Sequence, residues 1–103
     1  MPASPAAARS APGLLRLFIA GQSPRSLDAF ANLRTICDEH LPGQYEIEVI
    51  DLIEHPELAA LHDVLALPTL IRVDPPPTRR IIGNLSDTQR VLTYLELRTA
   101  VTR

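Results

Sequence analysis

The 103-residue sequence predicts a single α/β domain whose elements follow in the order β-α-β-α-β-β-α. Three features support this: an apolar run followed by a capped amphipathic helix, a segment alternating between apolar and acidic residues, and two apolar runs separated by three prolines. Hydrophobic residues make up 46% of the chain, enough for a modest core without metals or disulfides. The start is rich in proline and alanine, so we expect a disordered leader over 1–13 and a folded domain over 14–103.

The first strand and helix are the most clearly marked elements. Residues 14–20 are almost wholly apolar and too few for a typical helix, so they predict a buried strand. Ser23 and Pro24 then favour a helix start, because a serine oxygen can accept from a free backbone N–H and proline has none to leave unpaired. Apolar residues recur every three or four positions until a Pro-Gly pair. The predicted apolar stripe consists of Leu27, Phe30, Leu33, Ile36, Cys37 and Leu41.

The middle of the chain predicts a strand and a short helix. Residues 45–52 have the two-residue period of a strand with one wetter face, and Glu46 and Glu48 suit an edge strand. A proline at position 56 favours a short helix with an acid in its first turn. Its expected apolar face consists of Leu58, Leu61 and Leu65.

The last third predicts a hairpin and a final helix. Residues 69–73 and 78–82 flank three prolines, a spacing that favours antiparallel strands. Ser86, with Gln89 three positions later, is a capping-box pattern, and we expect a helix over 87–98.

This order is that of a thioredoxin-like domain. Right-handed crossovers predict that the first three strands are parallel, that the fourth is antiparallel and that helices cover both faces of the sheet. Thioredoxin-like folds place a cis proline before the third strand, so we expect a cis bond at Pro68. Its role is architectural, or it also borders a binding surface.

The positions where such a fold carries redox chemistry hold no cysteine pair. The start of the first helix reads Ser23-Pro24-Arg25-Ser26, and hydroxyls cannot cycle between dithiol and disulfide. The single cysteine, Cys37, falls on the apolar side of the helix, where we expect a buried core residue. The sequence shows no zinc-site spacing, nucleophile elbow or glycine-rich phosphate loop. We therefore expect no enzyme activity, no cofactor and no metal.

Charge and hydropathy narrow the class of partner. Ten basic residues against twelve acidic ones give a net charge of −2, so no global field favours a nucleic acid. No apolar run approaches the roughly 18 residues that span a membrane, and we expect a cytoplasmic protein with neither partner. Arg72, Arg79 and Arg80 form the one basic cluster, either a solvated edge or a docking patch for an acidic protein surface.

Four strings stand out beyond their periodicity: LRLFIAGQSPRSLDAFANL, IEVIDLIEHPELA, LALPTLIRVDPPPTRRIIGNLSD and RVLTYLEL. They resemble the KaiB family, the small component of the cyanobacterial circadian oscillator and of related bacterial proteins. The resemblance implies a non-enzymatic protein with two folds, one typically tetrameric with a rearranged C-terminal half, the other monomeric and thioredoxin-like. The thioredoxin-like form binds the hexameric ATPase KaiC. Related domains occur at the N-terminus of a KaiC-binding histidine kinase.

For this chain the resemblance implies an adaptor that binds a KaiC-like ATPase or a signalling histidine kinase and modulates its output in circadian, stress or timing signalling. The basic positions of the family's hairpin are kept as Arg72, Arg79 and Arg80, which implies a partner-binding role. A homo-oligomer, dimer or tetramer, stays open. The alternative is a thioredoxin-like protein without redox cysteines that acts on a small molecule or an unrelated protein.

Departures from the family carry their own expectations. Acids stand where clock members have basic residues, which should weaken docking on the same acidic partner surface: Asp28, Glu48 and Asp63. The region of the fold switch holds Gly83, Tyr94 and Glu96, and clock members have Gly and Asp at the last two positions. Glycine disfavours a helix by about 1 kcal/mol, so we expect the thioredoxin-like state at rest.

Overall fold

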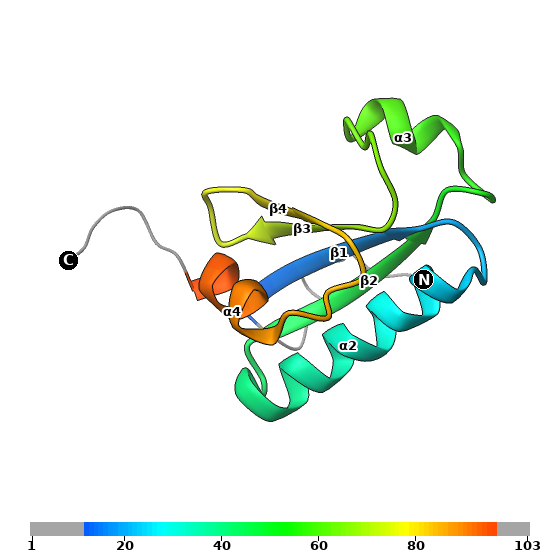
Figure 1. Cartoon of the computed structure of the whole chain (residues 1–103). Helices are drawn as coiled ribbons and strands as arrows, with labels where there is room; N and C mark the ends of the chain where they lie inside the picture. The colour runs from blue at the N-terminus through cyan, green and yellow to red at the C-terminus, as the bar shows by residue number, and fades with distance from the viewer. Residues whose placement is uncertain (1–11, 97–103) are drawn as a thin grey trace.

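The structure is a computed structural model that describes residues 12–96 (Figure 1). Most of the predicted leader, and the last two residues of the predicted final helix, lie outside the described part. The predicted order of elements is confirmed: β1 (Gly13–Ile19), α2 (Pro24–His40), β2 (Tyr45–Asp51), α3 (Glu57–Leu61), β3 (Thr69–Asp74), β4 (Arg79–Ile82) and α4 (Thr88–Glu96).

The strands form one mixed sheet in the order β2-β1-β3-β4, so β2 is an edge strand as predicted. β1 and β2 are parallel, and β3 and β4 are antiparallel. The prediction of three parallel strands was wrong, because β3 runs antiparallel to β1. The five-residue helix α3 spans only about 7.5 Å, against about 23 Å for a seven-residue strand. The chain therefore enters β3 at the end of the sheet where β1 and β2 finish, and Thr69 pairs with Phe18.

Helices α2 and α4 pack on the same face of the sheet, and α3 lies on the other side at one end (Figure 1). The main core lies between the sheet and the two long helices and includes Leu15, Leu17, Leu33, Ile36, Leu70, Ile81, Val91 and Leu95. A smaller cluster on the opposite face consists of Phe18, Leu52, Val64 and Ile71. The second face is therefore only partly covered, less than the predicted two-sided arrangement.

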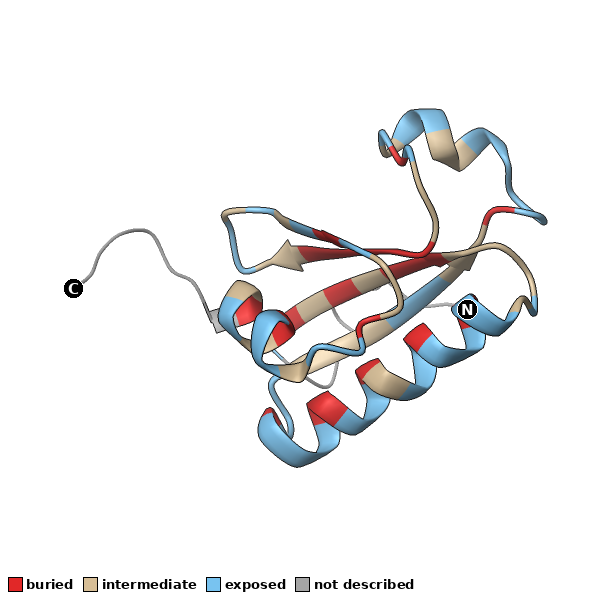
Figure 2. Ribbon diagram, viewed as in Figure 1, coloured by how far each residue is buried: buried red, intermediate tan, exposed pale blue. Residues whose placement is uncertain are grey.

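Helix α2 begins as predicted, with Ser23 as its N-cap and Pro24 in the first turn. Its buried stripe differs from the predicted one, since Leu27 is 51% exposed and Phe30 is 41% exposed. Ser26 and Ala29, one position earlier in each case, are buried instead, because one residue turns the helix by about 100°. Figure 2 shows buried residues along the side of α2 that faces the sheet and exposed residues on its outer side.

The predicted apolar face of the short helix was wrong in a similar way. Leu58 packs against the smaller cluster, whereas Leu61 is 72% exposed and Leu65 is 89% exposed. Because α3 is little more than one turn long, the helical period cannot carry Leu65 back to the face of Leu58. These leucines leave an apolar surface beside α3.

Helix α4 is confirmed, but its cap is Asp87 rather than Ser86. The Asp87 Oδ1 atom accepts from the Arg90 backbone N–H at 3.1 Å, and the Asp87 carbonyl accepts from the Val91 N–H at 3.0 Å. The Ser86 N–H donates to Asn84 Oδ1, which forms the turn before the helix. Ser86 thus lies one residue outside the capping position.

Candidate partner-binding surface

The three predicted arginines do not form one solvated cluster. Arg72 is buried, with 3% of its surface exposed, Arg79 is half-buried and Arg80 is exposed. Arg72 lies opposite Arg79, whereas Arg80 lies opposite Ile71. Because side chains alternate along a strand, Arg80 points to the other face of the sheet. The expectation of one surface patch was therefore wrong, while the role of these residues in partner binding stays a prediction.

Arg72 connects the sheet to the end of α4. Its Nη1 atom donates to the Leu95 carbonyl at 2.5 Å, and its Nη2 atom donates to the Pro77 carbonyl at 2.9 Å. The hydroxyl of Tyr45 donates to the same Leu95 carbonyl at 3.2 Å. A buried guanidinium needs hydrogen-bond acceptors, and two backbone carbonyls provide them here. A buried guanidinium at this point therefore stabilises the docking of α4.

The sequence did contain a signal for this role. Arg72 is two residues after Leu70, so the strand period places both on the helix-covered face. The prediction missed it because three arginines close in sequence suggested one charged surface, whereas the alternation of side chains along a strand places them on two faces of the sheet.

Arg80 belongs to the sheet face that α2 and α4 leave open. Its guanidinium donates to the backbone carbonyls of Asp63 at 3.0 Å and His62 at 3.3 Å, which connects β4 to the end of the α3 segment. The same face carries the ion pair of Arg16 with Glu48, at 2.5 Å. Strand pairing places Glu48, Arg16, Ile71 and Arg80 in one row across all four strands.

Two of the three acidic departures therefore lie beside arginines of this open face. Glu48 pairs with Arg16, and Asp63 lies next to Arg80 through its backbone carbonyl. Asp28 is exposed on α2, which covers the opposite face. The structure thus separates Asp28 from Glu48 and Asp63, and the effect of all three on docking stays a prediction.

The hydroxyls at the start of α2 have structural contacts. Ser23 Oγ accepts from the Ser26 N–H at 3.2 Å and donates to Ser26 Oγ at 2.9 Å. Ser26 Oγ also accepts from the Ala20 N–H at 3.1 Å and is part of a buried side chain. Ser23 and Ser26, at the positions where this fold carries a redox pair, therefore close the turn between β1 and α2.

Cys37 lies in the main core as predicted, with 6% of its surface exposed. Burial first and the nearby Asp38 second, partly opposed by Arg34, raise the pKa of its thiol from 9.0 to about 11. A protonated, buried thiol is a poor nucleophile. Cys37 therefore functions as a small apolar side chain of the core.

Pro68 follows a cis peptide bond, as predicted. Its carbonyl accepts from the Gly83 N–H at 3.0 Å, which brings the cis-proline turn to the end of β4. Gly83 has a φ of 124°, a region that glycine favours. Tyr94 is half-buried against the main core, and Glu96 is the last described residue of α4. One fold is observed, and the second family fold stays a prediction.

Within residues 12–96 no three His, Cys, Asp or Glu side chains are placed to hold a metal ion. In the same part of the chain, no helix combines the length and apolar character needed to span a bilayer.

Comparison with solved structures agrees with the predicted thioredoxin-like fold. The N-terminal domain of Synechococcus elongatus SasA superposes with a TM-score of 0.69 at 19% identity, covering 92% of this chain and 93% of that one. Mitochondrial thioredoxin 3 of Saccharomyces cerevisiae superposes with a TM-score of 0.67 at 18% identity, covering 84% of this chain and 80% of the thioredoxin. The thioredoxin-like fold is therefore confirmed.

Sequence comparison adds the family. Residues 16–97 match the model of the KaiB domain. The circadian clock oscillator protein KaiB of Prochlorococcus marinus (strain MIT 9313) is 46% identical over 84 residues, covering 82% of this chain and 71% of the relative. The circadian clock protein KaiB3 of a Synechocystis strain is also 46% identical, covering 82% of each chain. With its triple-proline hairpin and its thioredoxin-like fold, the chain belongs to the KaiB family of circadian clock proteins.

Proposed function

We propose that this protein is a cytoplasmic adaptor that binds a KaiC-like ATPase or a signalling histidine kinase and modulates the output of that enzyme. The observation that carries the proposal is the formed α4 helix of a KaiB-family chain, held in the thioredoxin-like state by Arg72 and Tyr45. The family resemblance assigns partner binding to this state. The alternative, action on a small molecule at Ser23 and Ser26, has less support because the two hydroxyls bond to each other and to the backbone.

The partner surface we propose is the open face of the sheet that carries Arg80. Arg80 is exposed beside the exposed residue Ile82, which provides a charged group and an apolar group on neighbouring positions. Arg79 lies opposite Arg72 and is directed to the other face of the sheet. Arg72 supports the surface from within, because it holds the triple-proline loop through the Pro77 carbonyl.

The test is binding to a purified KaiC-like ATPase or histidine kinase from the same organism. Arg80→Glu should weaken binding by about tenfold at low salt, equivalent to about 1.4 kcal/mol. Arg34→Glu, an equal charge change at an exposed position of α2, should alter it by less than about twofold. If no such ATPase or kinase binds the wild-type chain, the proposal fails. Equal losses for both variants would place the interface elsewhere.

The acidic residues of the open face give a second arm of this test. Glu48→Lys and Asp63→Lys should each strengthen binding if the partner surface is acidic, because each removes a repulsive carboxylate. Weaker binding by both variants would indicate a basic partner surface and contradict the proposed chemistry.

A further inference from the structure

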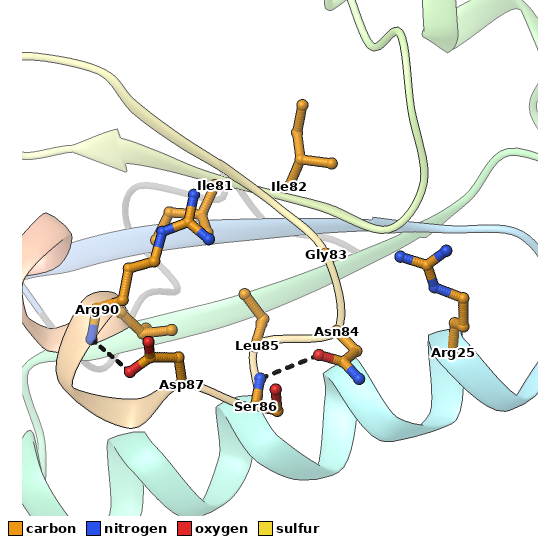
Figure 3. A pocket seen from close by; sticks show the side chains of 10 residues that line it. Arg25, Ile81, Ile82, Gly83, Asn84, Leu85, Ser86, Asp87 and Arg90 are labelled. Atoms are coloured by element: carbon orange, nitrogen blue, oxygen red, sulfur yellow. Dashed lines mark hydrogen bonds between the residues drawn. The ribbon is translucent and has the colours of Figure 1, made fainter.

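A pocket of about 370 Å³ lies between the start of α2, the end of β4 and the first turn of α4 (Figure 3). Its floor is apolar, since Ile81, Leu85 and Val91 are buried in the main core. Ile82, which is 50% exposed, lines the pocket from the end of β4, with its side chain towards the open face of the sheet. The pocket thus joins an apolar floor to a polar rim.

Two arginines from different helices flank the loop that forms this pocket. Figure 3 shows Arg25 of α2 on one side of the loop and Arg90 of α4 on the other. Within residues 12–96 Arg25 has no hydrogen-bond or ion-pair partner. The Arg90 guanidinium lies 5.9 Å from the centre of the Tyr94 ring, a contact that orients it without using its N–H donors.

The one carboxylate of the lining is already engaged. Asp87 caps α4 by accepting from the Arg90 backbone N–H. Two guanidinium groups therefore face one carboxylate, and the pocket carries a net positive charge.

Two backbone donors of the loop are used within the protein. The Ser86 N–H donates to Asn84, and the Gly83 N–H donates to the Pro68 carbonyl. The positive charges of the pocket that attract an anion are those of the arginine side chains. A guanidinium binds a carboxylate through two parallel hydrogen bonds, and a singly charged carboxylate meets less repulsion from Asp87 than a phosphate dianion does.

We propose that this pocket docks an acidic segment of a partner protein, in which Asp or Glu side chains reach Arg25 and Arg90 and a neighbouring apolar side chain covers Ile82. Charge complementarity selects the acidic residues, and the apolar floor selects a peptide over a free anion. The inference rests on the proposed function, since it takes the docked segment to belong to the bound enzyme.

The first experiment titrates the full chain with a blocked peptide of alternating Glu and Leu and follows the backbone amides by NMR. The amides of Gly83, Asn84 and Ser86 should shift, and Arg25→Gln and Arg90→Gln should each weaken binding by about tenfold. Arg34→Gln is the matched control, because it removes the same charge from an exposed position of α2. It should weaken binding by less than about twofold.

Several outcomes would overturn the inference. One is an equal loss in the Arg34→Gln control, which would mean non-specific attraction. Others are shifts on another surface, or inorganic phosphate competing as well as the peptide does. A blocked peptide of alternating Lys and Leu should not bind. If it binds, the charges of Arg25 and Arg90 do not select the ligand. All three arginines are exposed, so the variants should keep the wild-type melting temperature.

The second experiment measures binding of the same variants to the purified ATPase or kinase, which separates the two proposals. A wild-type chain that binds the enzyme, with an Arg25→Gln variant that binds equally well, would refute the pocket and leave the proposed function in place. A wild-type chain that binds the acidic peptide but neither enzyme would refute the proposed function and leave the chemistry of the pocket in place. Weaker enzyme binding by Arg25→Gln and Arg90→Gln, with unchanged binding by the Arg34→Gln control, supports both proposals.

Discussion

Replacing Arg72 by methionine should destabilise the protein far more than a surface arginine would. Arg72 is 3% exposed and donates to two backbone carbonyls, those of Leu95 and Pro77. Each hydrogen bond from a charged donor contributes about 1.5–3 kcal/mol. Removing a buried cation from the interior offsets part of that loss, and methionine keeps much of the apolar stem. The expected decrease in the free energy of unfolding is about 2–4 kcal/mol.

Urea denaturation followed by circular dichroism measures this loss, with an unchanged dependence on urea concentration as the sign that only stability changed. The melting temperature should fall by roughly 10–20 °C. Arg80→Met is the matched control from the same hairpin, and because its contacts are exposed it should cost less than about 1 kcal/mol. The reasoning is refuted if the two variants lose equal stability, or if Arg72→Met unfolds like the wild type.

The remaining predictions concern the helix cap, the core cysteine and the fold switch. Asp87→Ala should lower the free energy of unfolding by about 1 kcal/mol, and Ser86→Ala by less than about 0.5 kcal/mol, as measured by urea denaturation. A larger loss for Ser86→Ala would mean that Ser86, and not Asp87, caps α4. Because the folded Cys37 thiol has a pKa of about 11 against 9.0, its contribution to stability should be constant below about pH 9 and decline as the pH rises towards 11. Cys37→Ala should abolish that decline in pH-dependent unfolding. Tyr94→Gly should remove core packing and about 1 kcal/mol of helix propensity and raise the population of a second fold in NMR spectra; a single set of peaks from partly unfolded chain would argue against a switch.

Local patterns predicted the elements well, because caps, periodicity and prolines act over a few residues. Ser23 caps α2, Pro68 is cis and Cys37 is buried, each as expected from its immediate neighbours. The direction of β3 was not predictable in that way. The direction of β3 depends on the length of α3, because a long helix would return the chain to the start of the sheet. The sequence pattern does not give that length, and the structure shows a helix of five residues.

The predicted arginine patch was wrong in part because a shift of one residue along a strand moves a side chain to the other face of the sheet. Arg79 and Arg80 are neighbours in sequence, yet only Arg80 reaches the open face of the sheet. Arg25 and Arg90 are 65 positions apart, counted from their numbers in the chain, and no spacing rule relates them. The loop that places them around one pocket exists only in the folded molecule.

The meeting of Arg72 and Tyr45 at the Leu95 carbonyl has a consequence for the order in which the chain matures. Both donors leave the ribosome before their acceptor, since Leu95 follows Arg72 by 23 positions and Tyr45 by 50. Until then the nascent chain holds a hydrated guanidinium at a position that the finished protein buries. The covered face of the sheet can close only after α4 has been synthesised, because Val91 and Leu95 complete the main core and α4 follows every other described element in the chain.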